Sequence, residues 1–306
     1  MKRVGFFYDD VFLRHETPPG HPECAERLLA IIKSLLGSDI AGKLVHKSPR
    51  RAELREIEAV HDPDYVRKVA GFTGYFDPDT YISPGSYEAA LYAAGSVPGA
   101  LELIKKGELD RAFCAVRPPG HHAERDRGMG FCIFNNVAVG AKAAQRLGFE
   151  RVFIVDFDVH HGNGTQHIFY EDPSVFYFST HQYPFYPGTG ADSERGKGAG
   201  AGATYNVPMA AGSGVKQYLR VYQDLLPPLM ARFKPDVVLV SAGYDIYSND
   251  PLASINVSEE GIREIVEGIL RAASAVPSVF VLEGGYDLGA LGNLVVITLE
   301  RMLYSI

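Results

Sequence analysis

Residues 154–165, IVDFDVHHGNGT, concentrate side chains that can bind a metal ion or transfer protons. The apolar residues of this stretch predict a buried strand, and an unpaired carboxylate at the end of such a strand is costly to bury. Asp156, Asp158 and His160 occupy alternate positions, so a strand that continued through them would point their side chains to one face. Glycine and asparagine at 162–164 then favour a turn. This spacing predicts a ligand site at the carboxyl end of a strand.

Other chemically capable residues follow three further strand-like segments. The motifs SAGYD, EGGYD and RPPGHHA supply Asp245, Tyr286 and the neighbouring pair His121 and His122. Because the carboxyl ends of parallel strands meet at one edge of a sheet, we expect these side chains to approach the DFDVHH stretch. Strand alternation turns His161 away from the ligand face, so we predict a structural role for it.

These residue types together favour metal-assisted hydrolysis. Asp158, His160 and Asp245 make a three-ligand set with a free position, the arrangement of catalytic rather than structural zinc. Oxygen and nitrogen ligands without a thiolate also accept Fe2+, so the ligand types leave the metal open between zinc and iron. The metal would activate a water, a histidine would transfer protons, and Tyr286 could hydrogen-bond a developing oxyanion.

Strands and helices are predicted to alternate along the chain. Apolar runs predict strands at residues 3–8, 111–116, 152–159, 175–180, 236–241 and 279–282. Amphipathic or capped segments predict helices ending near residue 36, over 53–60, 89–106, 136–147, 215–233 and 259–274, and at the end of the chain up to Ile306. Asp62 or Asp64 is expected to begin one more helix, and Ser258 to cap another. Residues 77–87, 117–136 and 183–204 are predicted to be loops, and long loops are usually functional.

This alternation indicates an α/β fold. The predicted strands are continuous apolar runs, as expected for a parallel sheet that is covered by helices on both faces. No linker, repeat or low-complexity segment is evident. We therefore predict a single three-layer domain over residues 1–306, with a central parallel sheet flanked by helices.

Composition narrows the classes of function. The 306 residues are 46% hydrophobic and 22% charged, which is typical of a globular chain with a large core. No apolar run approaches the length of a membrane span, and the opening MKRVGFFYDD does not resemble a secretory signal. A net charge of −7 without an extended basic cluster makes direct binding to nucleic acid unexpected. The three cysteines lack disulfide or metal-finger spacing, so a cytoplasmic location is expected.

Six motifs in register resemble those of the histone deacetylase family, which includes acetoin-utilisation proteins and acetylpolyamine amidohydrolases. The motifs are RPPGHHA, GFCIFNN, DFDVHHGNGT, YPGTG, SAGYD with DPL after it, and EGGYD, and PGHPECAERL and VHDPDYV are similar too. The resemblance covers essentially the whole chain, and the Asn163 and EGGY variants are more similar to class II than to class I. It implies an arginase-like α/β fold with a central parallel sheet.

The resemblance also implies catalytic roles for the matching residues. They would be the zinc ligands Asp158, His160 and Asp245, the general base His122, a largely electrostatic His121 supported by Asp156, and the oxyanion donor Tyr286. Asn163 would face His122. A neutral amide cannot stabilise an imidazolium as a carboxylate does, so His122 is expected to favour its neutral, base-competent form.

Further implied residues concern the substrate and a second ion. Gly130, Phe131 and Tyr186 would line a narrow channel for an acylated lysine, and the family often has Phe where Tyr186 stands. Leu252 occupies the position at which acetylpolyamine-selective members can carry Glu, which favours acyl-lysine or another mono-cationic N-acyl substrate. The family's structural potassium would use Asp156 and Ser179 together with main-chain oxygens of Asp158, His160 and Thr180.

Several functions remain open at this point. The favoured one is a zinc-dependent amidohydrolase acting on N-acyl-lysine in proteins or peptides, and the nearest alternative acts on acetylpolyamines or other small N-acyl amines. A non-catalytic acyl-binding regulator is disfavoured by the intact Tyr286, His121 and His122. A dinuclear, arginase-like hydrolase would need bridging carboxylates where the two histidines stand. The oligomeric state and the accepted acyl-chain length are left open.

Overall fold

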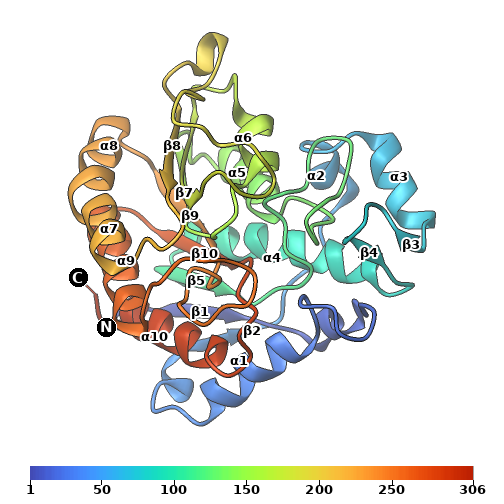
Figure 1. The fold of residues 1–306 in the computed structure, drawn as a ribbon. Coiled ribbons are helices and arrows are strands. Elements are labelled where there is room, and N and C mark those ends of the chain that lie inside the picture. Colours follow the sequence, from blue (N-terminus) through green and yellow to red (C-terminus); the bar gives the residue numbers. More distant parts are fainter. Residues whose placement is uncertain (306) are drawn as a thin grey trace.

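The computed structural model describes residues 1–305. Its strands are β1 (Val4–Phe7), β2 (Val45–Lys47), β3 (Gly74–Tyr75), β4 (Tyr81–Ile82), β5 (Arg111–Cys114), β6 (Val152–Asp156), β7 (Val175–Gln182), β8 (Thr204–Met209), β9 (Val237–Ala242) and β10 (Ser278–Leu282). Eight of them form one sheet in the order β2-β1-β5-β10-β9-β6-β7-β8 (Figure 1). All neighbouring pairs in this sheet are parallel, and β3 and β4 form a separate antiparallel pair.

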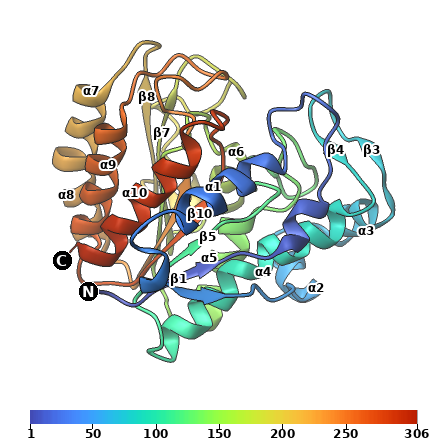
Figure 2. The ribbon, with the colours of Figure 1, turned by 90° about the horizontal axis from the view of Figure 1, so that it is seen from below.

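Helices cover both faces of the sheet. They are α1 (Glu26–Leu36), α2 (Leu54–Glu58), α3 (Pro63–Gly71), α4 (Ser86–Lys105), α5 (Asn136–Arg146), α6 (Asn163–Phe169), α7 (Val215–Leu219), α8 (Leu226–Phe233), α9 (Glu259–Ala272) and α10 (Leu291–Tyr304). Short 3-10 turns lie at Asp10–Arg14, Ala41–Lys43 and Gly198–Gly200. Helices α7, α8, α9, α10 and α1 lie on one face, and α4 and α5 pack together on the other (Figure 2). The predicted three-layer α/β fold is therefore confirmed.

The central strands form because their residues can be buried on both faces. Every residue of β9 (VVLVSA) and of β10 (SVFVL) is buried. Valine, isoleucine and phenylalanine favour such a pleated interior, and each fully buried apolar side chain contributes about 1.5–3 kcal/mol. Helix α9 begins where predicted, because the Ser258 hydroxyl accepts a hydrogen bond from the backbone N–H of Gly261 at 3.2 Å.

Several element boundaries differ from the predictions. The strand predicted at 152–159 ends at Asp156, three residues early. The helix predicted at 215–233 is a continuous helical run, but a π-helical turn at Arg220–Leu225 separates α7 from α8. The predicted surface loop at 77–87 contains β4 and ends in the first turn of α4, with four buried residues, Thr80, Ile82, Ser83 and Ser86. Helix α10 ends at Tyr304, and Ile306 lies outside the described residues.

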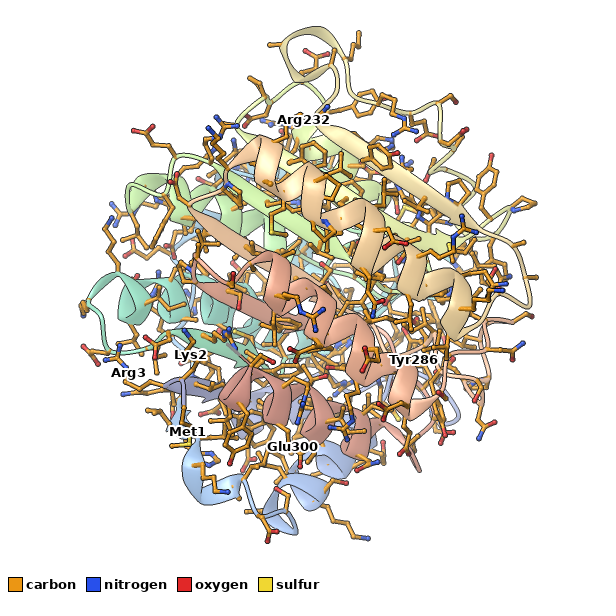
Figure 3. All side chains as sticks on the ribbon, turned by 90° about the vertical axis from the view of Figure 1, so that its left-hand side faces the viewer. Met1, Lys2, Arg3, Arg232, Tyr286 and Glu300 are labelled. Carbon is orange, nitrogen blue, oxygen red and sulfur yellow. The ribbon has the colours of Figure 1, made fainter. Side chains whose placement is uncertain are left out.

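The topology places the candidate residues at one edge of the sheet. β5, β10, β9, β6 and β7 are consecutive neighbours, so the segments that follow them leave the same edge side by side. Lys2 and Arg3, which precede β1, lie on the opposite side of the molecule from Tyr286, which follows β10 (Figure 3). Within residues 1–305, no helix combines the length and apolar character that crossing a membrane requires.

Candidate active site

Asp158, His160 and Asp245 form a compact group of possible metal ligands. Their ligand atoms lie within 4.8 Å of one another. The Nδ1 atom of His160 is 3.2 Å from Oδ1 of Asp158 and 3.2 Å from Oδ2 of Asp245. Both carboxylates are buried, and the His160 side chain is 12% exposed. The structure thus brings together the three residues that the sequence predicted as ligands.

The backbone reaches this arrangement through turns and not through a continuing strand. After Asp156 the backbone N–H of Asp158 donates to the Asp156 carboxylate at 3.2 Å, and the backbone N–H of His160 donates to the Asp158 carboxylate at 2.9 Å. The expectation that strand alternation aligns all three side chains is therefore wrong. Asp158 and His160 turn toward Asp245, whereas the Asp156 carboxylate pairs with His121.

The charges and hydrogen bonds of this group fit a divalent cation. Burial, together with the charge of Asp158, raises the pKa of Asp245 to about 7. Burial lowers the pKa of His160, but the two neighbouring carboxylates outweigh it and raise that pKa to about 10. Oδ2 of Asp245 is buried, and although Nδ1 of His160 lies 3.2 Å away, no donor within residues 1–305 is aligned to form a hydrogen bond with it. A cation held by the three ligand atoms would satisfy this oxygen and offset the two carboxylate charges.

His121 and His122 lie next to each other, with 4.1 Å between ring centroids. Nδ1 of His121 is 3.0 Å from the Asp156 carboxylate, and nearby carboxylates outweigh burial to raise the pKa of His121 to about 10. Nδ1 of His122 is 2.8 Å from Oδ1 of Asn163. Burial and then the neighbouring histidines lower the pKa of His122 well below its usual value. His122 is therefore the neutral member of the pair at pH 7, as a general base requires.

Tyr286 reaches the site from the loop after β10. Its backbone N–H donates to the Asp250 carboxylate at 2.6 Å, which holds the turn. Its ring meets Phe131 edge to face, with centroids 5.9 Å apart, and the guanidinium carbon of Arg27 lies 4.9 Å from its centroid. A side chain at Gly284 would collide with the carboxylates of both aspartate ligands. Residue 284 therefore has to be glycine for the turn to approach Asp158 and Asp245 closely.

A cavity of about 250 Å3 opens beside this group. Its lining includes His122, His160 and Tyr286 and the four residues predicted to line a substrate channel, Gly130, Phe131, Tyr186 and Leu252. Gly130 has a φ of +56°, and a side chain there would collide with the His122 ring. The Tyr186 ring stands edge to face against His122, with centroids 5.2 Å apart. Phe185 and Asp79 also line the cavity and are not singled out by the sequence.

The residues predicted to hold potassium lie where β6 pairs with β7. Asp156 is opposite Ser179 in this register, and Thr180 follows in β7. All three side chains are buried. The Ser179 hydroxyl is 2.8 Å from Nδ1 of His181, so it is partly engaged within the chain.

Two buried glutamates contact the site and are not predicted by the sequence. Glu283 accepts hydrogen bonds from the backbone N–H of Gly120 at 2.7 Å and from the Ser241 hydroxyl at 3.0 Å. Its signal in the sequence is the same as that of Asp156, an acid residue at the end of an apolar strand. Glu124 accepts from the side-chain amide of Asn163 at 2.6 Å. It lies in an irregular loop, and no periodic pattern points to it.

A buried ion cluster joins the loops around the site. Nε and Nη2 of Arg117 both donate to the Glu23 carboxylate, Nη2 at 2.8 Å, and Arg27 donates to Glu23 at 3.1 Å. Arg27 also donates to the carbonyl oxygen of Gly285 at 2.7 Å, directly before Tyr286. These three charged side chains are fully buried. They fix the loop that precedes α1 against the loops that follow β5 and β10.

Two further residues, His161 and Cys132, lie beside the ligand group of Asp158, His160 and Asp245 without belonging to it. His161, predicted to be turned away, has its ring nitrogens 2.7 Å from the Thr189 hydroxyl and 3.0 Å from Oε1 of Gln166. Cys132 is a buried free thiol that lines the cavity, and burial raises its pKa well above the usual value. A thiol with a raised pKa is a poor nucleophile, in line with a packing role.

Comparisons with known proteins agree with this geometry. The histone deacetylase domain family matches residues 21–302. A probable deacetylase of Archaeoglobus fulgidus is 39% identical over 297 residues, covering 94% of this chain and 83% of the relative. Histone deacetylase 5 of Arabidopsis thaliana is 38% identical over 317 residues, covering 96% of this chain and 48% of the relative, so the chain spans about half of that protein. The crystal structure of the HDA15 HD domain superposes with a TM-score of 0.93 at 36% identity, covering 99% of this chain and 91% of the other.

Proposed function

The chain belongs to the histone deacetylase family and is a hydrolytic deacetylase, and from this premise we propose that it is zinc-dependent and removes acetyl groups from N-acyl-lysine in peptides or proteins. The observation that carries the proposal is the convergence of Asp158, His160 and Asp245 beside a narrow cavity that His122 and Tyr286 also line.

Zinc held by these three residues would polarise the scissile carbonyl and lower the pKa of a water molecule. The protons are handled by the chain's own groups. Because Nδ1 of His122 donates to Asn163, the Nε2 lone pair is free to take a proton from the attacking water and later pass it to the leaving amine. The Tyr286 hydroxyl would donate to the oxyanion that develops on the carbonyl oxygen.

His121 would act electrostatically. Its pairing with Asp156 keeps a positive charge next to the reacting amide, where negative charge develops. We assign a structural potassium ion to Asp156 and Ser179 and to the main-chain oxygens of Asp158, His160 and Thr180. Such an ion would offset the buried negative charge of Asp156.

The cavity walls support a mono-cationic substrate with an apolar stem. Phe131, Phe185 and Tyr186 offer ring surfaces for the methylene groups of a lysine side chain. Leu252 brings no charge to the lining. Asp79, however, lines the same cavity, and a carboxylate there would attract a second ammonium group. This residue favours acetylpolyamines as the second candidate substrate class.

Hydrolysis of an acetyl-lysine peptide, compared with N-acetylputrescine and N-acetylspermidine, tests the proposal. We expect a higher kcat/KM for the peptide, and a loss of about 10²–10³ in kcat for Tyr286→Phe, because one oxyanion donor is removed. A higher kcat/KM for the polyamines would show that acetylpolyamines, and not acetyl-lysine peptides, are the preferred substrates. Turnover of neither substrate by zinc-loaded protein would contradict both.

Three free cysteines and the moderate acidic charge support two further proposals. We propose that the protein works in the reducing cytoplasm and that it binds neither nucleic acid nor membranes directly.

A further inference from the structure

The amide of Asn163 bridges two different groups. Its Oδ1 faces Nδ1 of His122 at 2.8 Å, and its Nδ2 faces Oε1 of Glu124 at 2.6 Å. An amide oxygen only accepts and an amide nitrogen only donates, so this orientation requires that His122 carries its proton on Nδ1. The position of the proton on His122 is thus coupled to the orientation of the Asn163 side chain.

Glu124 is held rigidly behind this amide. Its backbone N–H donates to the Arg127 carbonyl at 2.9 Å, and Nδ1 of His167 lies 2.8 Å from the same oxygen that accepts from Asn163. The Glu124 residue is 7% exposed. Burial alone would raise its pKa, but the hydrogen bond and charge of His167 lower it, so the group is a carboxylate that only accepts hydrogen bonds.

The other contacts of Asn163 would not fix its orientation. Its Nδ2 lies 3.4 Å from the His122 carbonyl oxygen and 3.5 Å from the Met129 sulfur, both of which are weak acceptor contacts. If the amide turned over, its oxygen would face the Glu124 carboxylate and its nitrogen would face His122. His122 would then need a lone pair on Nδ1, and its proton would move to Nε2, where a general base needs a lone pair.

We propose that Glu124 is a positioning residue for deacetylation: its carboxylate fixes the Asn163 amide so that His122 keeps its proton on Nδ1 and its lone pair on Nε2. This role rests on the proposed function of His122 as general base. Glu124 does not contact the reacting atoms. It acts through Asn163, and it is needed because an amide, unlike a carboxylate, has two chemically different ends.

The difference between an amide and a carboxylate gives a specific test. In the natural chain, Glu124→Ala should lower kcat by roughly tenfold or more with little change in KM, because most of the protein would hold the unproductive tautomer. With Asn163→Asp, both ends of residue 163 accept, so no orientation has to be fixed. The introduced carboxylate would instead repel Glu124, and adding Glu124→Ala should then raise kcat by about threefold or more.

The matched variant Glu124→Gln keeps an acceptor for Asn163 and can offer a donor to a carboxylate. It should retain at least about a third of the natural kcat with Asn163, and it should raise kcat when combined with Asn163→Asp. Glu171→Ala serves as the control, since Glu171 is an exposed glutamate near the end of α6 that pairs with Lys197 at 3.6 Å. If Glu124→Ala fails to fold, Glu124→Gln provides the test in its place. A decrease in kcat when Glu124→Gln is added to Asn163→Asp, where an increase is expected, would contradict the proposal.

A readout without turnover separates this inference from the proposed function. In 15N-histidine NMR spectra, with the His122 signals assigned by their absence from His122→Ala, the natural chain should show Nδ1 protonated. Glu124→Ala should show a population with Nε2 protonated. An unchanged tautomer, or an equal loss of kcat with Asn163 and with Asn163→Asp, would overturn the role of Glu124. Failure of the natural chain to hydrolyse any acetylated amine would count against the proposed function alone.

Discussion

His122 is the residue whose protonation should limit the rate in acid. Burial and the neighbouring histidines lower its pKa well below the usual 6.5. A general base is lost when it is protonated, and a group with a lowered pKa is protonated only at lower pH. We therefore expect kcat to stay at its plateau value at pH 6.5 and to decrease only at lower pH. The measurement is kcat against pH with an acetyl-lysine peptide, and a half-maximal rate above pH 6.5 would contradict the assignment.

Asn163 should shift this acidic limb when it is replaced by a carboxylate. A negative charge 2.8 Å from Nδ1 of His122 would stabilise the imidazolium and raise its pKa, so the limb should move to higher pH. Because Glu124 lies 2.6 Å from the Asn163 amide, the introduced carboxylate is best studied together with Glu124→Gln. The comparison is the pH profile of Glu124→Gln with and without Asn163→Asp. Coincident acidic limbs would show that residue 163 does not tune His122.

The central strands could be predicted from the sequence, whereas the edge strands β2 and β8 could not. β9 and β10 are continuous apolar runs, and burial on both faces requires such runs. β2 has three residues and none of them is buried, so no hydrophobic pattern marks it. β8 follows a glycine-rich loop and has only three buried residues of six, and α6 begins inside the glycine and asparagine run predicted as a turn.

The sequence predicted those site residues that directly follow apolar strands. Asp158 and Asp245 follow apolar strands, and buried acids in such places require a partner. The turns that aim them are fixed by hydrogen bonds between backbone and carboxylates, which leave no periodic signal. Glu124 and Asp250 lie in loops and act on Asn163 and Tyr286 through single contacts. Such contacts depend on tertiary structure and cannot be derived from local spacing.

The loops around the site should depend on the buried Glu23. Its carboxylate joins the loop before α1 to Arg117 after β5 and to Arg27 in α1. Removal of one partner leaves buried charges without compensation, so Glu23→Ala is expected to lower the free energy of unfolding by about 3–5 kcal/mol. Chemical denaturation measures this loss, with the exposed Glu26→Ala as the control. Equal stability of the two variants would show that the cluster does not hold the loops.

The same cluster gives stability a definite pH dependence. Burial opposes ionisation of Glu23, but Arg117 and the other partners hold the pKa of Glu23 well below the usual 4.5. A lowered pKa contributes stability above the pKa of the unfolded chain, and this contribution is lost as the pH falls toward the folded value. The difference in unfolding free energy between the natural chain and Glu23→Ala should therefore shrink below about pH 4.5. A constant difference across that range would contradict an ionised Glu23.

For the whole molecule, the ligand group of Asp158, His160 and Asp245 joins the ends of two neighbouring inner strands of the sheet. β9 and β6 are neighbours, and the segments that follow them bring Asp245 to Asp158 and His160. A cation that binds the folded chain stabilises it by about 2.7 kcal/mol at one hundred times its Kd, and by about 4.1 kcal/mol at one thousand times. Zinc should therefore raise Tm by several degrees in metal-stripped protein, and Asp245→Ala should abolish this shift.

The metal content distinguishes this site from a dinuclear one. Within residues 1–305, the other group of possible ligands, His121, Cys132 and Glu283, shares no residue with Asp158, His160 and Asp245, so no ligand bridges the two groups. Nδ1 of His121 is also paired with Asp156. Elemental analysis of zinc-reconstituted protein should give one zinc per chain, and Asp245→Ala should give none. Two metal ions per chain would favour the dinuclear, arginase-like alternative. One ion that raised Tm but remained after Asp245→Ala would place the binding site elsewhere in the molecule.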